Sequence, residues 1–483
     1  MALSFGTSGV RGLATEFTDQ QVYILVSAFI KYADTLEICK YVATGYDLRE
    51  SSPKILNAVH RAIADHSKLI FSCGAIPTPS LAFYSRENKT LAIMVTGSHI
   101  PADRNGVKFY LETGETLKHD DNAIFSEYLK LKEENYQRDL FDTNGDFISK
   151  NDPVIANTGT DCQDLFTARY IDFFKDINLN SYKILFYEHS SVARNIAPAI
   201  LEQLGANLVR LGRSDKFIPV DTEAVDSLAQ FQKWIIEYKA DALVSTDGDG
   251  DRPLVVDNQG LIIQGDKLGM ITSQYLDIQA VALPISCNSG ILEMKEFKEI
   301  VFTKIGSPFV VAALNELAKK HDKVAGFEAN GGYILNSNIS KKGSVLKTLP
   351  TRDSVLPIVA LLAMAANKKI SPSELINQLP QKYTASILVK KCPVETSIKI
   401  LEKVKVYSKA VIQDILGGSV SVSSISMLDG VRITTNEGEI IHFRPSGNAP
   451  EFRCYVEANT QKKAEQIASN AKKFIVRLGQ IGS

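Results

Sequence analysis

Short apolar runs alternate with amphipathic helical patterns along most of the chain, and this alternation limits the folds that the chain can adopt. Residues 41–44, 69–72 and 91–95 have the length and composition of buried strands, and residues 55–66 have a helical pattern. Strands that are separated by helices are typical of βαβ units, in which the strands lie parallel. We therefore predict α/β domains with mixed, mostly parallel sheets.

The alternation recurs twice before the sequence changes character. Strand-like runs lie at 182–187, 207–211 and 242–244, and again at 280–286, 300–303 and 324–327. The segment 371–382 is rich in Pro, Gln and Ser, which is typical of a linker. Beyond it, four short strands lie between two helical patterns. The tail is therefore predicted to be a small α+β domain.

The length of 483 residues exceeds what a single hydrophobic core usually supports. We expect three similar α/β domains and a smaller C-terminal α+β domain. The predicted domains are residues 1–155 with a serine loop, 156–257 with an aspartate loop, 258–370 with a loop at 326–332 and 371–483 with a loop at 444–453.

The charges nearly cancel, with 54 basic and 55 acidic residues and a net charge of −1. No global basic field supports a nucleic-acid or membrane partner.

The six cysteines are scattered without a C-x-x-C pair, as in reduced proteins, and no nucleotide-binding glycine motif is present. The first six residues lack signal-peptide character, and the apolar stretch 358–366 is too short to span a bilayer. We expect a cytoplasmic protein.

A serine follows the predicted strand at 91–95. Ser98 is not in a G-x-S-x-G elbow, because Ile100 occupies the position of the second glycine. Asn105-Gly106 predicts a hairpin turn that folds Lys108 back toward Ser98. A lysine there could neutralise a phosphate or move a proton. A plain turn serine is the alternative, since the serine alone is weak evidence.

The aspartate loop alternates carboxylates with glycine at Asp247, Asp249 and Asp251. An EF-hand calcium loop needs glycine at its sixth position and glutamate at its twelfth, where this chain has Arg252 and Asn258. Three carboxylates leave positions on Mg²⁺ for a phosphate oxygen and water. A presented serine and a carboxylate metal loop together predict phosphoryl transfer through a phosphoserine.

Three further segments could bind phosphate or sugar. Residues 5–12, which include Arg11, are predicted to be a glycine-rich anion-binding loop, and a flexible arm is the alternative. Residues 444–453 are predicted to bind phosphate, and a surface turn is the alternative. Glu328 and Asn330 lie on the same side if their segment is extended, and both can bind sugar hydroxyls; a turn is the alternative. Ligand loops in open parallel sheets lie at the carboxyl ends of strands, so several of these loops could converge on one cleft.

Taken together, these motifs resemble the α-D-phosphohexomutase family, which includes phosphomannomutases and phosphoglucomutases. The resemblance covers nearly the whole chain, and its motifs occur in the family's order at 5–12, 96–101 with Lys108, 247–252, 326–332 and 444–453. It implies four domains around a central cleft. It also implies transfer of phosphate between O1 and O6 of a hexose, with a hexose 1,6-bisphosphate as intermediate and activator.

The resemblance also implies roles for individual residues. Ser98 is expected to carry the phosphate and to complete a Mg²⁺ site with Asp247, Asp249 and Asp251. The groups implied around the transferring phosphate are Arg11, His99 and Lys108. The residues implied in substrate binding are Arg252, Lys304, Glu328, Asn330, Arg444, Ser446, Gly447, Asn448 and Arg453. The implied partner is a small sugar phosphate, and the implied assembly is a monomer or a homodimer.

The sugar loop departs from the family pattern, which commonly reads G-E-x-S-G and is often followed by histidine. Here Phe327 precedes Glu328, Asn330 replaces the serine, and Gly332 stands at the histidine position. The preferred sugar and the general base therefore stay open, with Lys108 or Arg11 left to act as base. Phosphomannomutase is the leading hypothesis. Phosphoglucomutase or a dual-specificity enzyme comes next, followed by a phosphoglucosamine mutase, a sugar phosphatase and a non-catalytic relative.

Overall fold

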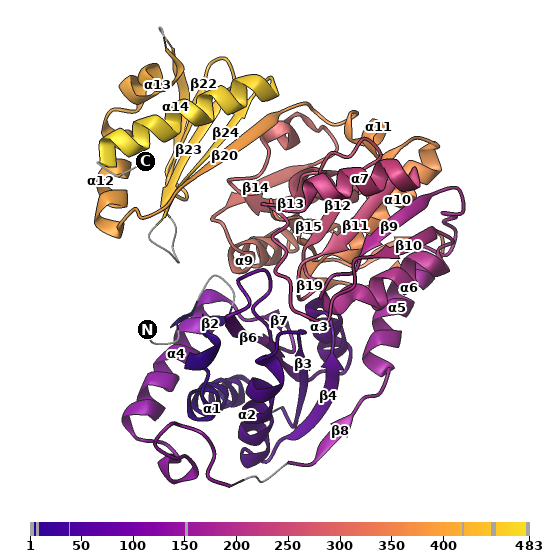
Figure 1. The fold of residues 1–483 in the computed structure, drawn as a ribbon, viewed down its shortest axis with the longest axis vertical. Coiled ribbons are helices and arrows are strands. Elements are labelled where there is room, and N and C mark those ends of the chain that lie inside the picture. The colour runs from indigo at the N-terminus through magenta and orange to yellow at the C-terminus, as the bar shows by residue number, and fades with distance from the viewer. Residues whose placement is uncertain are drawn as a thin grey trace. The chain divides into compact units, whose positions relative to one another are not determined.

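The computed structural model describes residues 4–5, 9–37, 39–149, 153–417, 420–445 and 451–479 (Figure 1). The chain divides into two compact units. Unit 1 holds Met1–Ala282 and Gly306–Ile376, and unit 2 holds Leu283–Ile305 and Asn377–Ser483. No helix in the described part of the chain is long and apolar enough to cross a membrane.

The first sheet of unit 1 mixes parallel and antiparallel strands in the order β1-β2-β6-β5-β3-β4-β8, with β7 paired to β6. Its strands are β1 (Ser4–Phe5), β2 (Val10–Leu13), β3 (Tyr41–Tyr46), β4 (Leu69–Ala75), β5 (Leu91–Val95), β6 (Arg104–Leu111), β7 (Gly114–Glu115) and β8 (Ile155–Asn157). Its helices are α1 (Asp19–Leu36), α2 (Ser52–Asp65), α3 (Thr78–Glu87) and α4 (Lys118–Glu133).

Strand β5 is buried along its whole length, which explains its continuous apolar sequence. Leu91, Ile93 and Val95 join the core that α1, α2 and α4 form on one face of the sheet. Met94 lies on the other face, beside Leu81 of α3. The sheet is therefore covered by helices on both sides (Figure 1).

Two further sheets follow the same plan. The second has the order β10-β9-β11-β12, and the third has the order β14-β13-β15-β16-β19. The strands are β9 (Lys183–Tyr187), β10 (Asn207–Leu211), β11 (Ala242–Thr246), β12 (Pro253–Asp257), β13 (Ala280–Pro284), β14 (Glu299–Thr303), β15 (Val324–Phe327), β16 (Tyr333–Leu335) and β19 (Leu349–Asp353). A separate ribbon pairs β17 (Ile339–Lys341) with β18 (Ser344–Leu346). The helices are α5 (Asp161–Phe173), α6 (Ile196–Gln203), α7 (Leu228–Tyr238), α8 (Gly265–Tyr275), α9 (Ser307–Leu317), α10 (Val355–Lys368) and α11 (Pro372–Ile376).

The same hairpin recurs in all three sheets. Strands β5, β11 and β15 each run parallel to one neighbour and pair antiparallel with the strand that follows them. The connecting loops, at 96–103, 247–252 and 328–332, are the serine, aspartate and sugar loops of the sequence. The fold therefore places all three at the carboxyl ends of parallel strands.

The sheet of unit 2 is antiparallel throughout, in the order β20-β24-β23-β22-β21. Its strands are β20 (Tyr383–Val389), β21 (Val422–Ser426), β22 (Val431–Thr435), β23 (Ile440–Pro445) and β24 (Phe452–Ala458). Its helices are α12 (Val394–Val406), α13 (Ser408–Leu416) and α14 (Gln461–Gly479), and α14 packs along β20 and β24 (Figure 1). The predicted fold class, three mixed α/β sheets and a C-terminal α+β part, is confirmed.

Two local predictions are wrong. The segment 371–382 is not an open linker, because it contains α11, with Leu375 completely buried. Asn105-Gly106 is not a turn but lies within β6. A Cβ atom on Gly106 would lie 2.6 Å from the Val10 carbonyl oxygen and 2.8 Å from that of Thr96, so glycine is needed here for close backbone approach. The expected domain boundaries near 155, 257 and 370 stay predictions.

Candidate active site

The serine loop presents Ser98 to the aspartate loop. Ser98 is completely buried and has a φ of 55°, in the left-handed region that residues with a side chain rarely adopt. Its hydroxyl donates a hydrogen bond of 2.6 Å to Oδ2 of Asp247. The two loops, which are far apart in the sequence, therefore meet at the side chains predicted to act together.

Three separate elements of unit 1 hold the backbone of the aspartate loop. The amide of Thr78, at the start of α3, donates to the Asp249 carbonyl at 2.9 Å. The Val192 amide donates to the Gly248 carbonyl at 3.1 Å, and the Ser354 hydroxyl donates to the Gly250 carbonyl at 2.7 Å. Thr78 begins α3, Val192 follows β9 and Ser354 directly follows β19, so segments next to all three sheets hold this loop.

Two of the loop carboxylates have one oxygen held by outer partners. Oδ2 of Asp249 accepts from Lys108 Nζ at 2.7 Å and from the Thr78 hydroxyl at 2.6 Å. Oδ2 of Asp251 accepts from Lys108 Nζ at 2.9 Å and from Arg352 Nη2 at 2.8 Å. Such partners orient a carboxylate and leave its second oxygen for a ligand.

The three aspartates fit a divalent cation. Each offers one oxygen, and these atoms lie within 4.8 Å of one another. Within the described residues, Oδ1 of Asp249 and Oδ1 of Asp251 are buried and lack a hydrogen-bond partner. Burial, followed by the charges of the other two aspartates, raises the pKa of Asp247 well above its usual range. A cation bound by all three would relieve this repulsion, and an all-oxygen donor set suits Mg²⁺.

Cationic groups surround the carboxylates. Burial alone would lower the pKa of Lys108, but Asp249 and Asp251 outweigh burial and raise it above the usual lysine value. In the same way Arg352, Lys108 and Arg252 outweigh burial and hold the pKa of Asp251 well below its usual range. Lys108 and Asp251 are therefore both ionised at neutral pH.

His99 lies next to the serine and is neutral. Arg252 Nη1 donates to its Nδ1 at 2.8 Å, and the Ser98 hydroxyl lies 3.4 Å from the same atom. The charge of Arg252, then burial and the charge of Arg11, hold the pKa of His99 far below 6.5. Burial, then Arg252 and Arg352, lower the pKa of Arg11 to about 10, so Arg11 remains a cation near neutral pH.

The sugar loop is a tight turn, not an extended segment. Its backbone closes through the bonds from Gly331 to the Glu328 carbonyl, at 2.9 Å, and from Glu328 to the Gly332 carbonyl, at 3.2 Å. The Asn330 side chain accepts from the Gly332 amide at 2.9 Å. Oε2 of Glu328 accepts from Arg352 Nη1 at 3.2 Å. Through Arg352, the sugar loop thus contacts the aspartate loop.

The remaining predicted residues belong to unit 2. Arg444 donates to Oδ1 of Asp429 at 3.0 Å, and Oδ2 of Asp429 accepts at 2.9 Å from the amide of Ile305, which follows Lys304. Arg444 lies opposite Arg453 in the β23–β24 register. Ser446, Gly447 and Asn448 lie outside the described residues. Unit 2 therefore brings two predicted arginines together on adjacent strands.

The sequence analysis missed several residues that shape this site. Thr78 and Arg352 bind the aspartates, and Asp47 and Arg49 bind the serine loop. Asp47 and Arg49 follow a predicted strand, as the three functional loops do, so the same rule could have identified them. Thr78 and Arg352 carry no local signal, because their partners lie far away in the sequence.

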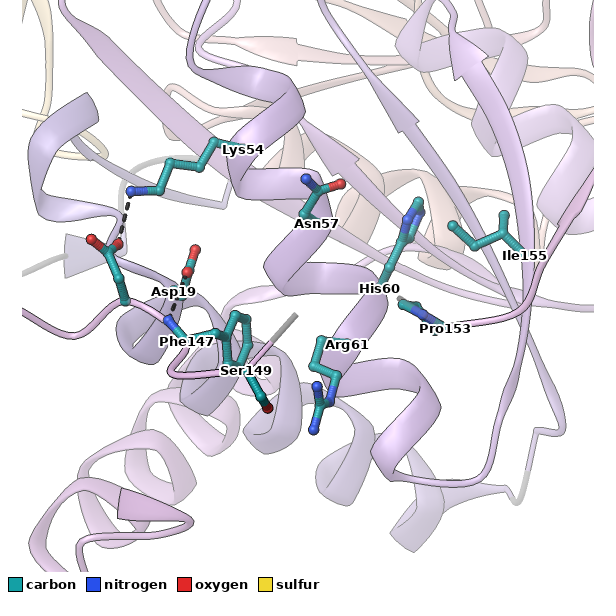
Figure 2. Close-up of a pocket in the computed structure, with 10 residues that line it drawn as sticks. Asp19, Lys54, Asn57, His60, Arg61, Phe147, Ser149, Pro153 and Ile155 are labelled. Carbon is teal, nitrogen blue, oxygen red and sulfur yellow. Dashed lines mark hydrogen bonds and ion pairs between the residues drawn. The ribbon is translucent and has the colours of Figure 1, made fainter. Parts of the chain in front are cut away.

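A separate hollow in unit 1 has a volume of about 640 Å³ and lies between α2 and the chain around Phe147 (Figure 2). Its charged groups all have partners: Lys54 pairs with Asp146 at 2.8 Å, Asp19 accepts from the Phe147 amide at 3.1 Å, and Arg61 pairs with Asp65 at 3.0 Å. Of the predicted site residues that the structure describes, none lines this hollow.

Comparisons with known proteins cover nearly the whole chain. Models of the phosphoglucomutase/phosphomannomutase family match residues 2–135 (alpha/beta/alpha domain I), 168–260 (domain II), 264–383 (domain III) and 390–473 (C-terminal domain). A phosphomannomutase of Salmonella muenchen is 39% identical over 98% of this chain and 97% of its own. A phosphomannomutase of Sinorhizobium fredii is 40% identical over 97% of both chains.

The fold also matches solved structures. A phosphoglucomutase/phosphomannomutase family protein from Burkholderia thailandensis is similar with a TM-score of 0.77, over 99% of this chain and 98% of its own. Its sequence identity is 18%, so this likeness concerns the fold alone.

Proposed function

The chain belongs to the phosphoglucomutase/phosphomannomutase family, and from this premise we propose that it interconverts mannose 1-phosphate and mannose 6-phosphate through a phosphoserine at Ser98. As a member, it is an intramolecular phosphotransferase of the phosphomannomutase type. One observation carries the proposal. The Ser98 hydroxyl is within 2.6 Å of a carboxylate that belongs to a three-aspartate cation site.

The proposed reaction has two transfers. Phosphoserine 98 gives its phosphoryl group to the O6 hydroxyl of the hexose 1-phosphate, so the Ser–O–P bond breaks, a C6–O–P bond forms and the hydroxyl proton leaves. The serine regains its proton, and a hexose 1,6-bisphosphate is formed. After this intermediate reorients, its O1 phosphate returns to Ser98 and hexose 6-phosphate is released. Ser98 acts as the nucleophile, as in covalent catalysis generally.

We propose that Asp247, Asp249 and Asp251 hold Mg²⁺ together with the phosphate on Ser98. A bound Mg²⁺ supplies charge stabilisation to the transferring phosphoryl group. Lys108, held between Asp249 and Asp251, orients both carboxylates. Because Lys108 and Arg11 both remain cations near neutral pH, we assign them to phosphate oxygens and not to proton abstraction.

The other predicted residues bind the two ends of the substrate in this proposal. Glu328 and Asn330 contact the sugar hydroxyls, and Arg252 with His99 faces the transferring phosphate. The residues assigned to the second phosphate are Lys304, Arg444, Ser446, Gly447, Asn448 and Arg453. The cross-strand placement of Arg444 and Arg453 supports this, because two guanidinium groups on adjacent strands can bind the same anion.

Phosphorus NMR tests the proposal. The protein is mixed with magnesium and a trace of hexose 1,6-bisphosphate, and the 1-phosphates of mannose, glucose and glucosamine are offered separately. We expect fastest conversion of mannose 1-phosphate, since two relatives of 39% and 40% identity over nearly the full length are phosphomannomutases. Faster conversion of another sugar would contradict the mannose preference. Release of inorganic phosphate alone would instead indicate a phosphatase.

A further inference from the structure

A buried arginine lies beneath the serine loop. Arg49 is 2% exposed and is one of the largest fully buried side chains. Its Nη1 donates to the carbonyls of Pro101 and Arg104, at 2.6 and 2.9 Å. Its Nη2 donates to the carbonyls of Ser98 and Ile100, at 3.0 and 2.7 Å. Four carbonyl groups between Ser98 and the first residue of β6, Arg104, therefore converge on a single guanidinium.

Asp47 binds the other half of the same loop. Its Oδ2 accepts from the Thr96 hydroxyl at 2.7 Å and from the Gly97 amide at 3.2 Å. The same oxygen accepts the fifth donor of Arg49, Nε, at 3.1 Å. All five donors of the guanidinium are thus used. We call Asp47 and Arg49 together the loop clamp: the carboxylate binds loop donors and the guanidinium binds loop acceptors.

The loop clamp is packed tightly on both sides. A Cβ atom on Gly97 would lie 2.6 Å from Cζ of Arg49, so only glycine leaves room for the guanidinium. The Phe217 ring covers the guanidinium at 4.0 Å. Gly248 of the aspartate loop lies close to the serine loop, since a Cβ atom on Gly248 would lie 2.7 Å from the Ser98 carbonyl oxygen. The clamp therefore lies where the serine and aspartate loops meet.

The backbone of Ser98 needs such support. A residue with a side chain costs roughly 1–2 kcal/mol in the left-handed region, and Ser98 adopts a φ of 55°. Its carbonyl points to Arg49 and its hydroxyl points to Asp247. Without the guanidinium, four carbonyls lose their donor, among them that of the completely buried Ser98, and the loop gains by rearranging. Rearrangement would move the Ser98 hydroxyl away from the aspartates.

We propose that Arg49 is a positioning residue for phosphoryl transfer, which holds Ser98 in the conformation that directs its hydroxyl to the aspartate loop. The inference rests on the proposed phosphoserine function. Arg49 acts through the loop backbone. Its loss should therefore lower kcat and leave KM for the sugar phosphate nearly unchanged.

Chemical rescue of Arg49→Ala tests the proposal. We expect kcat to fall about 100-fold, the usual cost of a small misplacement of a reacting group. Added methylguanidinium should raise the kcat of Arg49→Ala about tenfold, because it can enter the space left by the side chain and donate to the same carbonyls. Arg49→Lys should retain intermediate activity. Arg210→Ala is the matched control, since Arg210 pairs with Glu202 on the surface. It should change neither kcat nor the response to methylguanidinium.

Hydrogen exchange in Arg49→Lys is a second test that does not depend on activity. It still applies if Arg49→Ala does not fold or if the wild-type protein forms no phosphoserine. In Arg49→Lys, the amides of Gly97 and Ser98 should exchange about tenfold faster, because the loop opens locally more often. A folded Arg49→Ala protein with wild-type kcat would overturn the proposal. Two other results would also overturn it. One is an Arg49→Ala protein whose defect lies in KM and does not respond to methylguanidinium. The other is unchanged amide exchange in Arg49→Lys.

Discussion

Gly332 lies against the side chain of Arg352, and replacing it with alanine should disturb the active site. The new Cβ atom would lie 2.6 Å from Cδ, 2.7 Å from Cγ and 3.0 Å from Cβ of Arg352. These atoms form the stem of the side chain, not its flexible end. The end is held by Asp251 Oδ2, at 2.8 and 3.1 Å, and by Glu328, at 3.2 Å. Arg352 therefore cannot move aside without losing partners.

The expected cost follows from these contacts. Overpacking a buried site costs about 1–3 kcal/mol, and each charge-assisted hydrogen bond lost adds about 1.5–3 kcal/mol. Gly332 does not have a positive φ, so the alanine backbone itself is not strained. Alanine also reduces the entropy of the unfolded chain, which returns roughly 0.4–1 kcal/mol. If one such bond is lost, Gly332→Ala should therefore lower the free energy of unfolding by about 1.5–5.5 kcal/mol.

Urea unfolding of the single and double variants measures this cost. In an Arg352→Ala background the space is open, so Gly332→Ala should cost less than about 1 kcal/mol there. Gly74→Ala is a useful control, because no heavy atom lies within 4 Å of its Cβ position and only its left-handed backbone is strained. The reasoning is refuted if Gly332→Ala leaves stability unchanged, or if its cost is the same with and without the arginine.

Three further predictions concern the serine, the metal and pH. Ser98→Ala should take up no phosphate from hexose 1,6-bisphosphate, as read by intact mass, and full turnover by this variant would exclude the phosphoserine route. Asp249→Asn should weaken Mn²⁺ binding about tenfold or more in calorimetry, and unchanged binding would exclude the aspartate site. Burial lowers the pKa of His60 to about 4. The unfolded chain therefore binds the proton first as pH falls from 6.5 to 4, and stability drops by on the order of 3 kcal/mol across this window. His60→Gln should make this acid-induced loss shallower in urea unfolding across the same pH window.

Local patterns were enough to predict the parts of the fold that depend on burial. Strands β5 and β15 occupy the predicted residues, because a fully buried strand must be apolar along its whole length. The serine and aspartate loops were predictable for a related reason, since each interrupts an apolar pattern with polar groups at the end of a strand. Such a signal lies within a few residues and needs no tertiary information.

Pairing between distant segments was not predictable in this way. Arg352 binds a carboxylate 101 positions away in the sequence, and Thr78 binds one 171 positions away. For Asn105-Gly106, a local signal is present but gives a wrong prediction. The pair favours a turn locally, but the side chain of Asn105 binds Ser51 and Ser52, and Gly106 permits close strand contact. Tertiary packing here outweighs the local preference.

Carboxylates and cations from three different sheets meet at the site. Its carboxylates are Asp247, Asp249, Asp251 and Glu328, and its cations are Arg11, Lys108, Arg252 and Arg352. Lys108 comes from the first sheet, the aspartates from the second and Arg352 from the third. Charged groups from each sheet thus pair with charged groups from another sheet. These pairs form only when the sheets that carry them are packed together.

The opposite charges of the two expected ligands should couple their binding. A phosphate on Ser98 adds close to two negative charges, and Mg²⁺ adds two positive charges, so both together leave the balance unchanged. Either one alone unbalances a buried site, where charge is costly. Mn²⁺ should therefore bind more tightly to the phosphorylated protein than to the Ser98→Ala variant. Linkage requires the reverse as well, with the cation favouring the phosphoserine form. Calorimetry on both forms measures this coupling, and equal Mn²⁺ affinities would show that the phosphate and the cation bind independently.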